Sequence, residues 1–149
     1  MDKNKIIEAC FDILDQKISQ VKQAIHDSNT SLKEDTKSSA GDKYETSREM
    51  IQQDLNRYES QLHILNMDVE LLKRISTLKE KMDTVVLGSL VFTDKTIYFL
   101  ATSIGQVKID DKIVFSISSI SPIGKLLLGK TIGETFEFNG VKQIVESII

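Results

Sequence analysis

The sequence predicts an α+β protein in which an antiparallel helical hairpin, a coiled coil, precedes a small antiparallel sheet domain. Three observations support this prediction: two long segments of heptad periodicity, a polar stretch between them, and β-rich composition after residue 83. The chain has 149 residues, of which 40% are hydrophobic and one is proline, so it can bury a core. We expect the hairpin over residues 1–82, with its tip near 38–47, and the sheet domain over 83–149.

The first predicted helix carries apolar residues at alternating spacings of four and three, which is the pattern of a coiled-coil seam. The seam positions are Ile7, Phe11, Leu14, Ile18, Val21, Ile25, Ser28 and Leu32. Near the start of this helix Ile6, Cys10 and Ile13 widen the apolar face, which indicates that this end packs against more than one helix. Cys10 has no second cysteine to pair with, so we expect it to pack in the core.

The same spacing returns in a second predicted helix. Its seam positions are Ile51, Leu55, Tyr58, Leu62, Leu65, Val69 and Leu72, and Ile75, Leu78 and Met82 continue the apolar stripe. Two seams of about 25 residues, joined by a polar stretch, predict a hairpin whose arms reach roughly 40 Å. Because the two seams complement each other within one chain, we expect a monomer.

The remaining chain predicts an antiparallel sheet of four or five strands. The strand candidates are the β-branched or aromatic runs VVLGSLVF, TIYFLA, KIVFSI, ETFEF and VKQIVESI. The segment SPIGKLLLGKTIGE has a proline near its start and glycines near its end, so it predicts a short helix between strands. We expect Leu128, in the apolar run of that helix, to be buried.

The run SISSISPIGKLLLGKTIGETFEF resembles the signature of the Gre transcript-cleavage factors, and VVLGSLV is similar to the opening of that family's second domain. The matching positions are Ser121, Pro122, Ile123, Gly124, Lys125, Leu127, Leu128, Gly129, Lys130, Gly133 and Glu134. The resemblance implies an FKBP-like sheet domain after the hairpin, and bacterial RNA polymerase as the partner. It also implies that Ser121, Pro122, Ile123 and Gly124 dock at the rim of the polymerase secondary channel, while the hairpin reaches toward the active centre.

The predicted hairpin tip contains GDKYE, which places Asp42 and Glu45 three residues apart. Two carboxylates at this spacing can point to one side of a helical turn, and Mg²⁺ prefers such oxygen ligands. The Gre resemblance implies that they share a Mg²⁺ with RNA polymerase and stimulate its cleavage of backtracked RNA, without the protein being an enzyme or having a cofactor of its own. The alternative is a capping box, in which Asp42 caps the second helix and Glu45 reaches back.

The rest of the tip departs from the Gre pattern. Lys43, Tyr44 and the following TSREM differ from the residues of that family, which keeps open a regulator or inhibitor that binds the secondary channel without stimulating cleavage. The cations near the tip are Lys33, Lys37, Lys43 and Arg48. The resemblance implies that they contact the 3′ end of the nascent RNA, although lysines on an exposed hairpin usually serve solvation alone.

Composition limits the functions and cellular locations that we expect for this protein. A net charge of −3 with interspersed signs does not indicate a strongly basic nucleic-acid surface, and His26 and His63 have no partners at metal-ligand spacing. A single cysteine and the absence of a run of roughly 20 apolar residues predict a cytoplasmic protein without a membrane partner. A peptidyl-prolyl isomerase or chaperone with an aromatic-lined pocket, and a dimerising coiled coil, remain as other readings.

Overall fold

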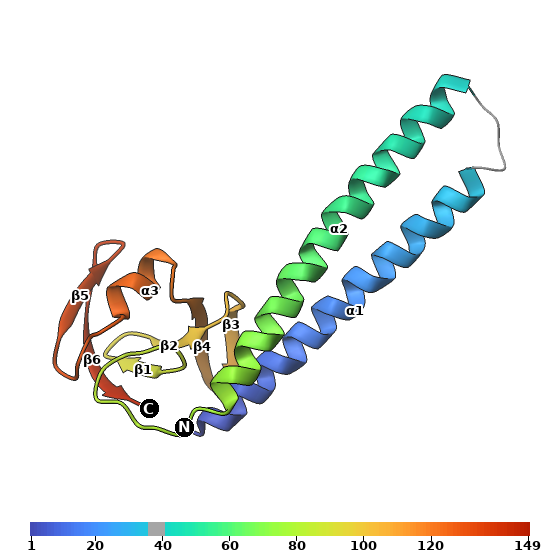
Figure 1. Ribbon diagram of the computed structural model, residues 1–149. Coiled ribbons are helices and arrows are strands. Elements are labelled where there is room, and N and C mark those ends of the chain that lie inside the picture. Colours follow the sequence, from blue (N-terminus) through green and yellow to red (C-terminus); the bar gives the residue numbers. More distant parts are fainter. Residues whose placement is uncertain (36–40) are drawn as a thin grey trace. The chain divides into compact units, whose positions relative to one another are not determined.

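The computed structural model describes residues 1–35 and 41–149, and the side chains of residues 1–34 and 45–149. Two long helices, α1 (Lys3–Asp35) and α2 (Gly41–Ser76), precede a six-stranded mixed sheet within this part of the chain (Figure 1). This arrangement confirms the predicted α+β class with a helical hairpin before a sheet. The fold divides into two compact units, a hairpin unit (Leu14–Asp68) and a sheet unit (Met1–Ile13 with Val69–Ile149).

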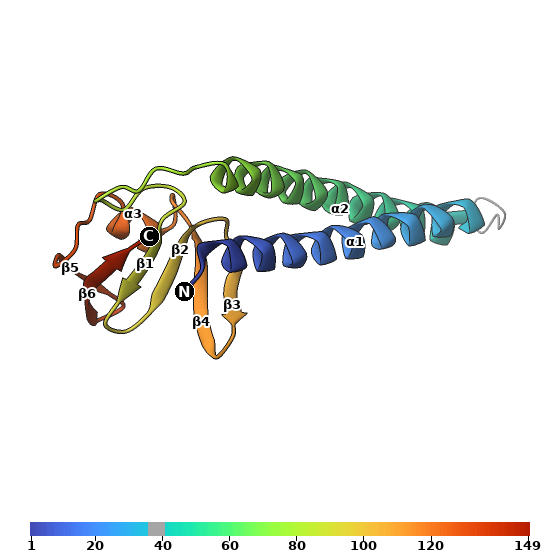
Figure 2. The same cartoon turned by 90° about the horizontal axis from the view of Figure 1, so that it is seen from below.

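In the hairpin unit, α1 and α2 lie side by side, as Figures 1 and 2 both show. The buried or half-buried seam residues are Leu14, Ile18, Val21, Ile25, Ser28 and Leu32 on α1, and Ile51, Leu55, Tyr58, Leu62 and Leu65 on α2. Their neighbours at other heptad positions are mostly exposed, so the heptad interpretation is confirmed. With 33 and 36 residues, the two helices extend about 50 and 54 Å at 1.5 Å per residue.

The sheet has the strand order β3-β4-β2-β1-β6-β5. The strands are β1 (Leu90–Thr93), β2 (Ile97–Ala101), β3 (Gly105–Ile109), β4 (Lys112–Ser118), β5 (Thr135–Phe138) and β6 (Val141–Ile148). The described pairs are antiparallel except β2 with β4, which run parallel with Tyr98 opposite Phe115. The prediction of a purely antiparallel sheet of four or five strands is therefore wrong in this pair and in the number of strands.

The unpredicted strand β3 is the reason for the parallel pair. After β2 the chain forms β3, turns tightly at Asp110, which has a positive φ of 53°, and returns as β4. This return places β4 between β3 and β2 and gives it the direction of β2. The sheet therefore gains a parallel pair without a helical crossover.

Both faces of the sheet are covered within the sheet unit. One face packs against the short helix α3 (Pro122–Leu127), and its buried cluster consists of Val85, Val91, Tyr98, Leu100, Ile123, Leu127, Phe136, Val145 and Ile148. On the opposite face, Ser116 of β4 forms a hydrogen bond with Cys10 of α1. Ile6, Cys10, Leu72 and Ile75 are all at most 1% exposed, so the prediction that the helices widen their apolar faces at this end is confirmed.

Helix α2 ends earlier than its apolar stripe predicts, at Ser76 instead of near residue 82. The hydroxyl groups of Ser76 and Thr77 donate hydrogen bonds of 2.6 and 2.7 Å to carbonyl oxygens of the preceding turn. Such bonds compete with helix continuation. Leu78 and Met82 follow the end of the helix and are 56% and 44% exposed, so they do not extend the packed stripe.

The predicted short helix is confirmed as α3, but the predicted burial of Leu128 is wrong. Leu127 is fully buried, whereas Leu128 is 42% exposed and lies just after the helix. Leu126 is half-buried and packs against the same cluster as Leu127, whereas Leu128 is the C-cap residue, where the backbone has already left helical geometry (φ −54°, ψ 128°). Among the described residues, no helix has a stretch long and apolar enough to cross a membrane.

Candidate functional site

The hairpin tip holds the predicted acids at the start of α2. Helix α2 begins at Gly41, so Asp42 is already helical, and Glu45 follows within the next turn. This position differs from the capping-box alternative, in which Asp42 precedes the first helical residue. The positive end of the helix dipole favours carboxylates in this turn. The side chains of Asp42 and Lys43, and the whole of Lys37, lie outside the described residues.

The tip side chains that the structure describes are solvent-exposed: Lys33, Glu45 and Arg48. Glu45 and Arg48 line a shallow hollow of about 330 Å³ together with Glu49 and Gln52. Glu45 and Glu49 are four residues apart, so their carboxylates emerge on the same side of α2. Glu49 is a tip acid that was not predicted, and its helical spacing from Glu45 is the signal in the sequence that marks it.

Metal-binding groups are sparse elsewhere in the described residues. No three His, Cys, Asp or Glu side chains of this part of the chain are placed to hold a metal ion. His26 and His63 are exposed on α1 and α2. A hard cation at the tip would therefore draw on carboxylates such as Glu45, together with ligands from a partner.

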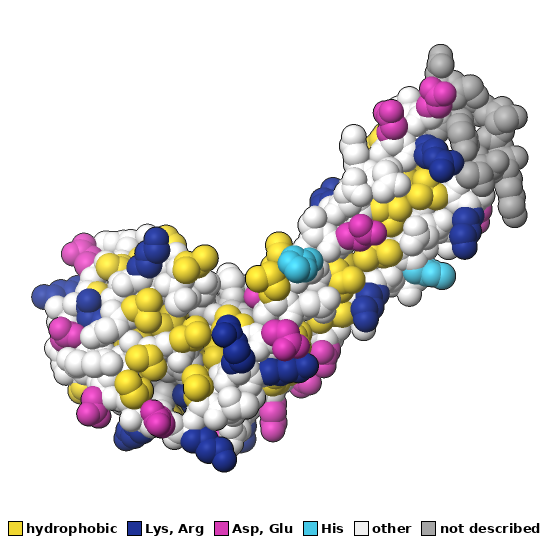
Figure 3. All heavy atoms as spheres, viewed as in Figure 1, with side chains coloured by type: hydrophobic (Ala, Val, Ile, Leu, Met, Phe, Trp, Pro, Cys, Tyr) yellow, Lys and Arg dark blue, Asp and Glu magenta, His cyan; other side chains and the backbone are white. Residues whose placement is uncertain are grey.

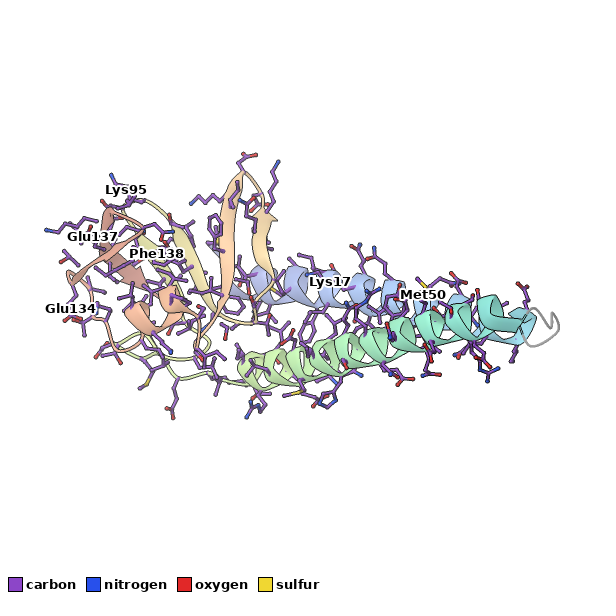
Figure 4. All side chains as sticks on the ribbon, turned by 90° about the horizontal axis from the view of Figure 1, so that it is seen from above. Lys17, Met50, Lys95, Glu134, Glu137 and Phe138 are labelled. Carbon is purple, nitrogen blue, oxygen red and sulfur yellow. The ribbon has the colours of Figure 1, made fainter. Side chains whose placement is uncertain are left out.

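Opposite charges on the two helices of the hairpin unit lie near each other, at a distance from the tip, without the short contact of an ion pair. Partial burial raises the pKa of Asp68 on α2, and the positive charge of Lys17 on α1 opposes this rise. Figure 4 labels Lys17 on its helix. Because Lys17 is exposed to solvent, this attraction contributes little to the stability of the hairpin.

The loop before α3 contains the residues predicted to dock on a partner. Ser121 precedes the helix, and its Oγ accepts a hydrogen bond from the Gly124 N–H at 3.1 Å and donates one to the Ser118 carbonyl at 2.6 Å. Pro122 is the first helical residue, where its missing N–H costs nothing. The local role of these two residues is thus to start α3, as the sequence allowed.

Burial separates the residues of this loop into two groups. Ile123 and Gly124 are buried, and a Cβ atom on Gly124 would overlap the Ser118 carbonyl oxygen. Pro122 is exposed, and Ile120 is 79% exposed. Any contact between this loop and a partner would therefore come from Ile120 and Pro122, with Ile123 and Gly124 holding the loop in place.

The aromatic residues of the sheet unit form packed core. The ring of Tyr98 lies 6.4 Å from those of both Phe115 and Phe136, and Tyr98 and Phe136 are 6% exposed. The Tyr98 hydroxyl also exchanges hydrogen bonds with the Gln143 amide at 3.0 and 3.2 Å. This arrangement uses the rings for packing and leaves them little surface to line a prolyl-peptide pocket.

Figure 3 shows where hydrophobic, acidic and basic side chains lie on one face of each unit. On the hairpin unit a stripe of hydrophobic atoms follows the seam between charged residues. Glu134 lies just before the edge strand β5 and Glu137 lies within it, and Figure 4 labels both. Charged side chains at an edge strand discourage pairing with other sheets.

Comparison with models of known protein families and with curated proteins finds no match for this chain.

Proposed function

We propose that this protein acts on bacterial RNA polymerase from its secondary channel and stimulates the polymerase's own cleavage of backtracked RNA. The observation that carries the proposal is the acidic start of α2, where the exposed Glu45 follows Asp42 by three residues in a two-helix hairpin. Helices about 50 Å long can carry such a group deep into a narrow channel. The resemblance of GDKYE and SPIGKLLLGK to the Gre signatures supports the same choice.

The chemistry assigned to the tip is metal donation. Mg²⁺ keeps several waters and accepts one or two protein carboxylates, so Asp42 and Glu45 can hold a second metal ion while the polymerase supplies the other ligands. The chemistry that such an ion would supply is activation of water for hydrolysis of the RNA phosphodiester, with Asp42 and Glu45 holding the ion. The protein supplies ligands for this reaction and the polymerase catalyses it.

Two further surfaces complete the proposal. The tip cations Lys33, Lys37, Lys43 and Arg48 would neutralise phosphates near the 3′ end of the RNA. The exposed Ile120 and Pro122 beside α3 would contact the channel rim. The buried aromatic rings of the sheet unit make this proposal preferable to a peptidyl-prolyl isomerase.

A second candidate is a secondary-channel regulator that does not stimulate cleavage. Arg48 favours it, because this cation lines the same hollow as Glu45. A guanidinium near a carboxylate competes with Mg²⁺ for the carboxylate oxygens. Both candidates share the partner and differ in the chemistry at the tip.

The experiment compares the wild type with Asp42→Asn, Asp42→Ala and Glu45→Gln in cleavage of backtracked RNA, polymerase affinity and thermal melting. Asp42→Asn should melt like the wild type and bind polymerase equally well, while cleavage falls at least about a hundredfold because a neutral amide is a poor Mg²⁺ ligand. Glu59→Gln, which removes an exposed acid of α2 away from the tip, is the matched control and should cleave normally.

Each outcome separates the candidates. Cleavage at the wild-type level by Asp42→Asn would exclude the metal role of this carboxylate. Polymerase binding without cleavage by the wild type would favour the non-cleaving regulator. No detectable binding of the wild type to polymerase would refute both candidates.

A further inference from the structure

All four methionines of this chain lie at the surface. Met1, Met50, Met67 and Met82 are 38%, 62%, 59% and 44% exposed. Methionine is usually among the buried residue types. The buried core of residues 1–34 and 45–149 consists mainly of leucine, isoleucine, valine and aromatic side chains, and it contains no methionine. The thioethers are therefore within reach of reagents dissolved in water, and none of them supports the core.

The three internal methionines lie where a polar group can be accommodated. Met50 and Met67 belong to α2 in the hairpin unit but not to its seam, and Figure 4 labels Met50 on this helix. Met82 lies in the segment that follows α2 in the sheet unit. Oxidation to a sulfoxide makes the side chain polar, which disrupts a packed core. At these three positions the added oxygen meets water, so the fold should tolerate it.

The one thiol of the chain is in the opposite situation. Cys10 is 0% exposed, and burial raises its pKa to about 11, although its hydrogen bond with Ser116 opposes this rise. The thiolate is the form that attacks peroxides, so both its burial and its high pKa protect Cys10 at neutral pH. The sulfur atoms are thus divided between a protected thiol in the core and accessible thioethers on the surface.

We propose that Met50, Met67 and Met82 are sites of reversible oxidation by hydroperoxides, and that the folded protein carries all three sulfoxides while Cys10 remains a thiol. A lone pair of the thioether sulfur attacks one oxygen of hydrogen peroxide, the O–O bond breaks and an S–O bond forms. The sulfur gives up two electrons, and the other oxygen leaves with both hydrogens as water. The inference does not depend on the proposed function, since neither Asp42 nor Glu45 takes part.

The test treats the full-length protein with hydrogen peroxide at neutral pH and follows each methionine by peptide mass spectrometry. In the folded protein Met50, Met67 and Met82 should oxidise within about threefold of their rates in urea-unfolded protein, because these side chains are already exposed. The melting temperature of the oxidised protein should fall by less than about 5 °C, since changes at the surface cost little. Two reductases, one for each sulfoxide epimer, should then restore the original mass.

A matched control places a thioether in the core. Leu127→Met changes a side chain that is 0% exposed with little change in volume. The new sulfur should oxidise at least about tenfold more slowly than Met67 in the folded variant and equally fast in urea, because peroxide reaches it only when the sheet unit opens. Cys10 is measured in the same samples by alkylation in urea after the peroxide has been removed, and alkylation should be as complete as in untreated protein.

Several results would overturn the proposal. They are protection of Met50, Met67 or Met82 by about tenfold or more in the folded protein, loss of the cooperative melt once the sulfoxides have formed, and loss of the Cys10 thiol as fast as the methionines oxidise. Sulfoxides that the reductases fail to restore would refute reversibility. Equal rates for Met67 and the sulfur introduced by Leu127→Met would show that exposure does not select the sites. If Leu127→Met does not fold, the comparison of folded with urea-unfolded wild type decides.

Discussion

Replacing Leu127 with alanine tests the core between α3 and the sheet. Leu127 is 0% exposed and belongs to the cluster that contains Val85, Phe136 and Val145. Truncating a buried leucine loses its transfer free energy and leaves a cavity, which together cost about 2–5 kcal/mol. The neighbours of Leu127 are held by backbone hydrogen bonds, including one of 2.9 Å from the Val85 N–H to the Lys130 carbonyl, so they can collapse only partly into the cavity.

We therefore expect the free energy of unfolding of the sheet unit to fall by about 3 kcal/mol, in the middle of this range. For a domain of this size the loss corresponds to a melting temperature lower by roughly 12–20 °C. Urea denaturation followed through amide signals of β2 and β6 measures the sheet unit separately from the hairpin unit. The signals of α2 between residues 45 and 65 provide a reference in the same sample.

The matched control is Leu128→Ala, one residue later at a position that is 42% exposed. It should cost less than about 1 kcal/mol, because most surface substitutions do. Equal losses from Leu127→Ala and Leu128→Ala would refute the assignment of the buried face of α3, and so would a Leu127→Ala variant as stable as the wild type.

Three further predictions concern packing and ionisation in the sheet unit. Gly124→Ala should lower the free energy of unfolding by at least about 2 kcal/mol, since the new methyl group meets the Ser118 carbonyl; an unchanged melting curve would contradict this close approach. Tyr98→Phe should cost about 1–3 kcal/mol in urea denaturation, because the buried Gln143 amide loses a hydrogen-bond partner; a neutral effect would show that water replaces the hydroxyl. Burial raises the pKa of Cys10 from 9.0 to about 11, and its hydrogen bond with Ser116 opposes this rise to a smaller extent. Because the thiol of the unfolded chain ionises first, the contribution of Cys10 to the free energy of unfolding should be fully present below pH 9 and be lost as the pH rises toward 11. Urea denaturation across this pH range should show a steeper decline for the wild type than for Cys10→Ala, and identical slopes would contradict the prediction.

Local periodicity predicted the hairpin well and the strands less completely. The seam residues Leu14 and Leu55 are buried as their heptad positions require, because a coiled coil depends on contacts that repeat along the sequence. Strand β3 also carried a local signal, since Val107 and Ile109 are buried and Lys108 between them is exposed, but the run is short and starts at a glycine. The parallel pairing of β2 with β4 depends on long-range register, which no local pattern contains.

The end of α2 shows how two local signals can conflict. Leu78 continues the apolar stripe at helical spacing, whereas Ser76 and Thr77 form hydrogen bonds that end the helix. The apolar stripe predicts continuation of the helix, but α2 ends at Ser76, where the two hydroxyl groups bond to carbonyl oxygens that a helix end leaves without N–H partners. Leu78 is therefore 56% exposed, although its place in the apolar stripe predicted burial.

The candidate site was predicted in part. The position of Glu45 on an exposed helical turn agrees with its spacing from Asp42. For the loop before α3, sequence similarity alone could not separate the exposed Pro122 from the buried Ile123 and Gly124. That separation depends on how α3 packs against β4, which is a tertiary property.

The position of β6 determines the order in which this protein can fold during synthesis. Although β6 is the last strand along the chain, it lies between β1 and β5, and Val91 pairs with Ile148. A ribosome releases β1 long before its neighbour exists, so the nascent chain carries an open strand edge until residues 141–148 emerge. Both helices of the hairpin unit are complete once residue 76 has emerged, so they can pair before the sheet strands are made. A stalled or shortened chain without β6 would therefore present a finished hairpin beside an incomplete sheet, which makes this product a ready substrate for chaperones and proteases.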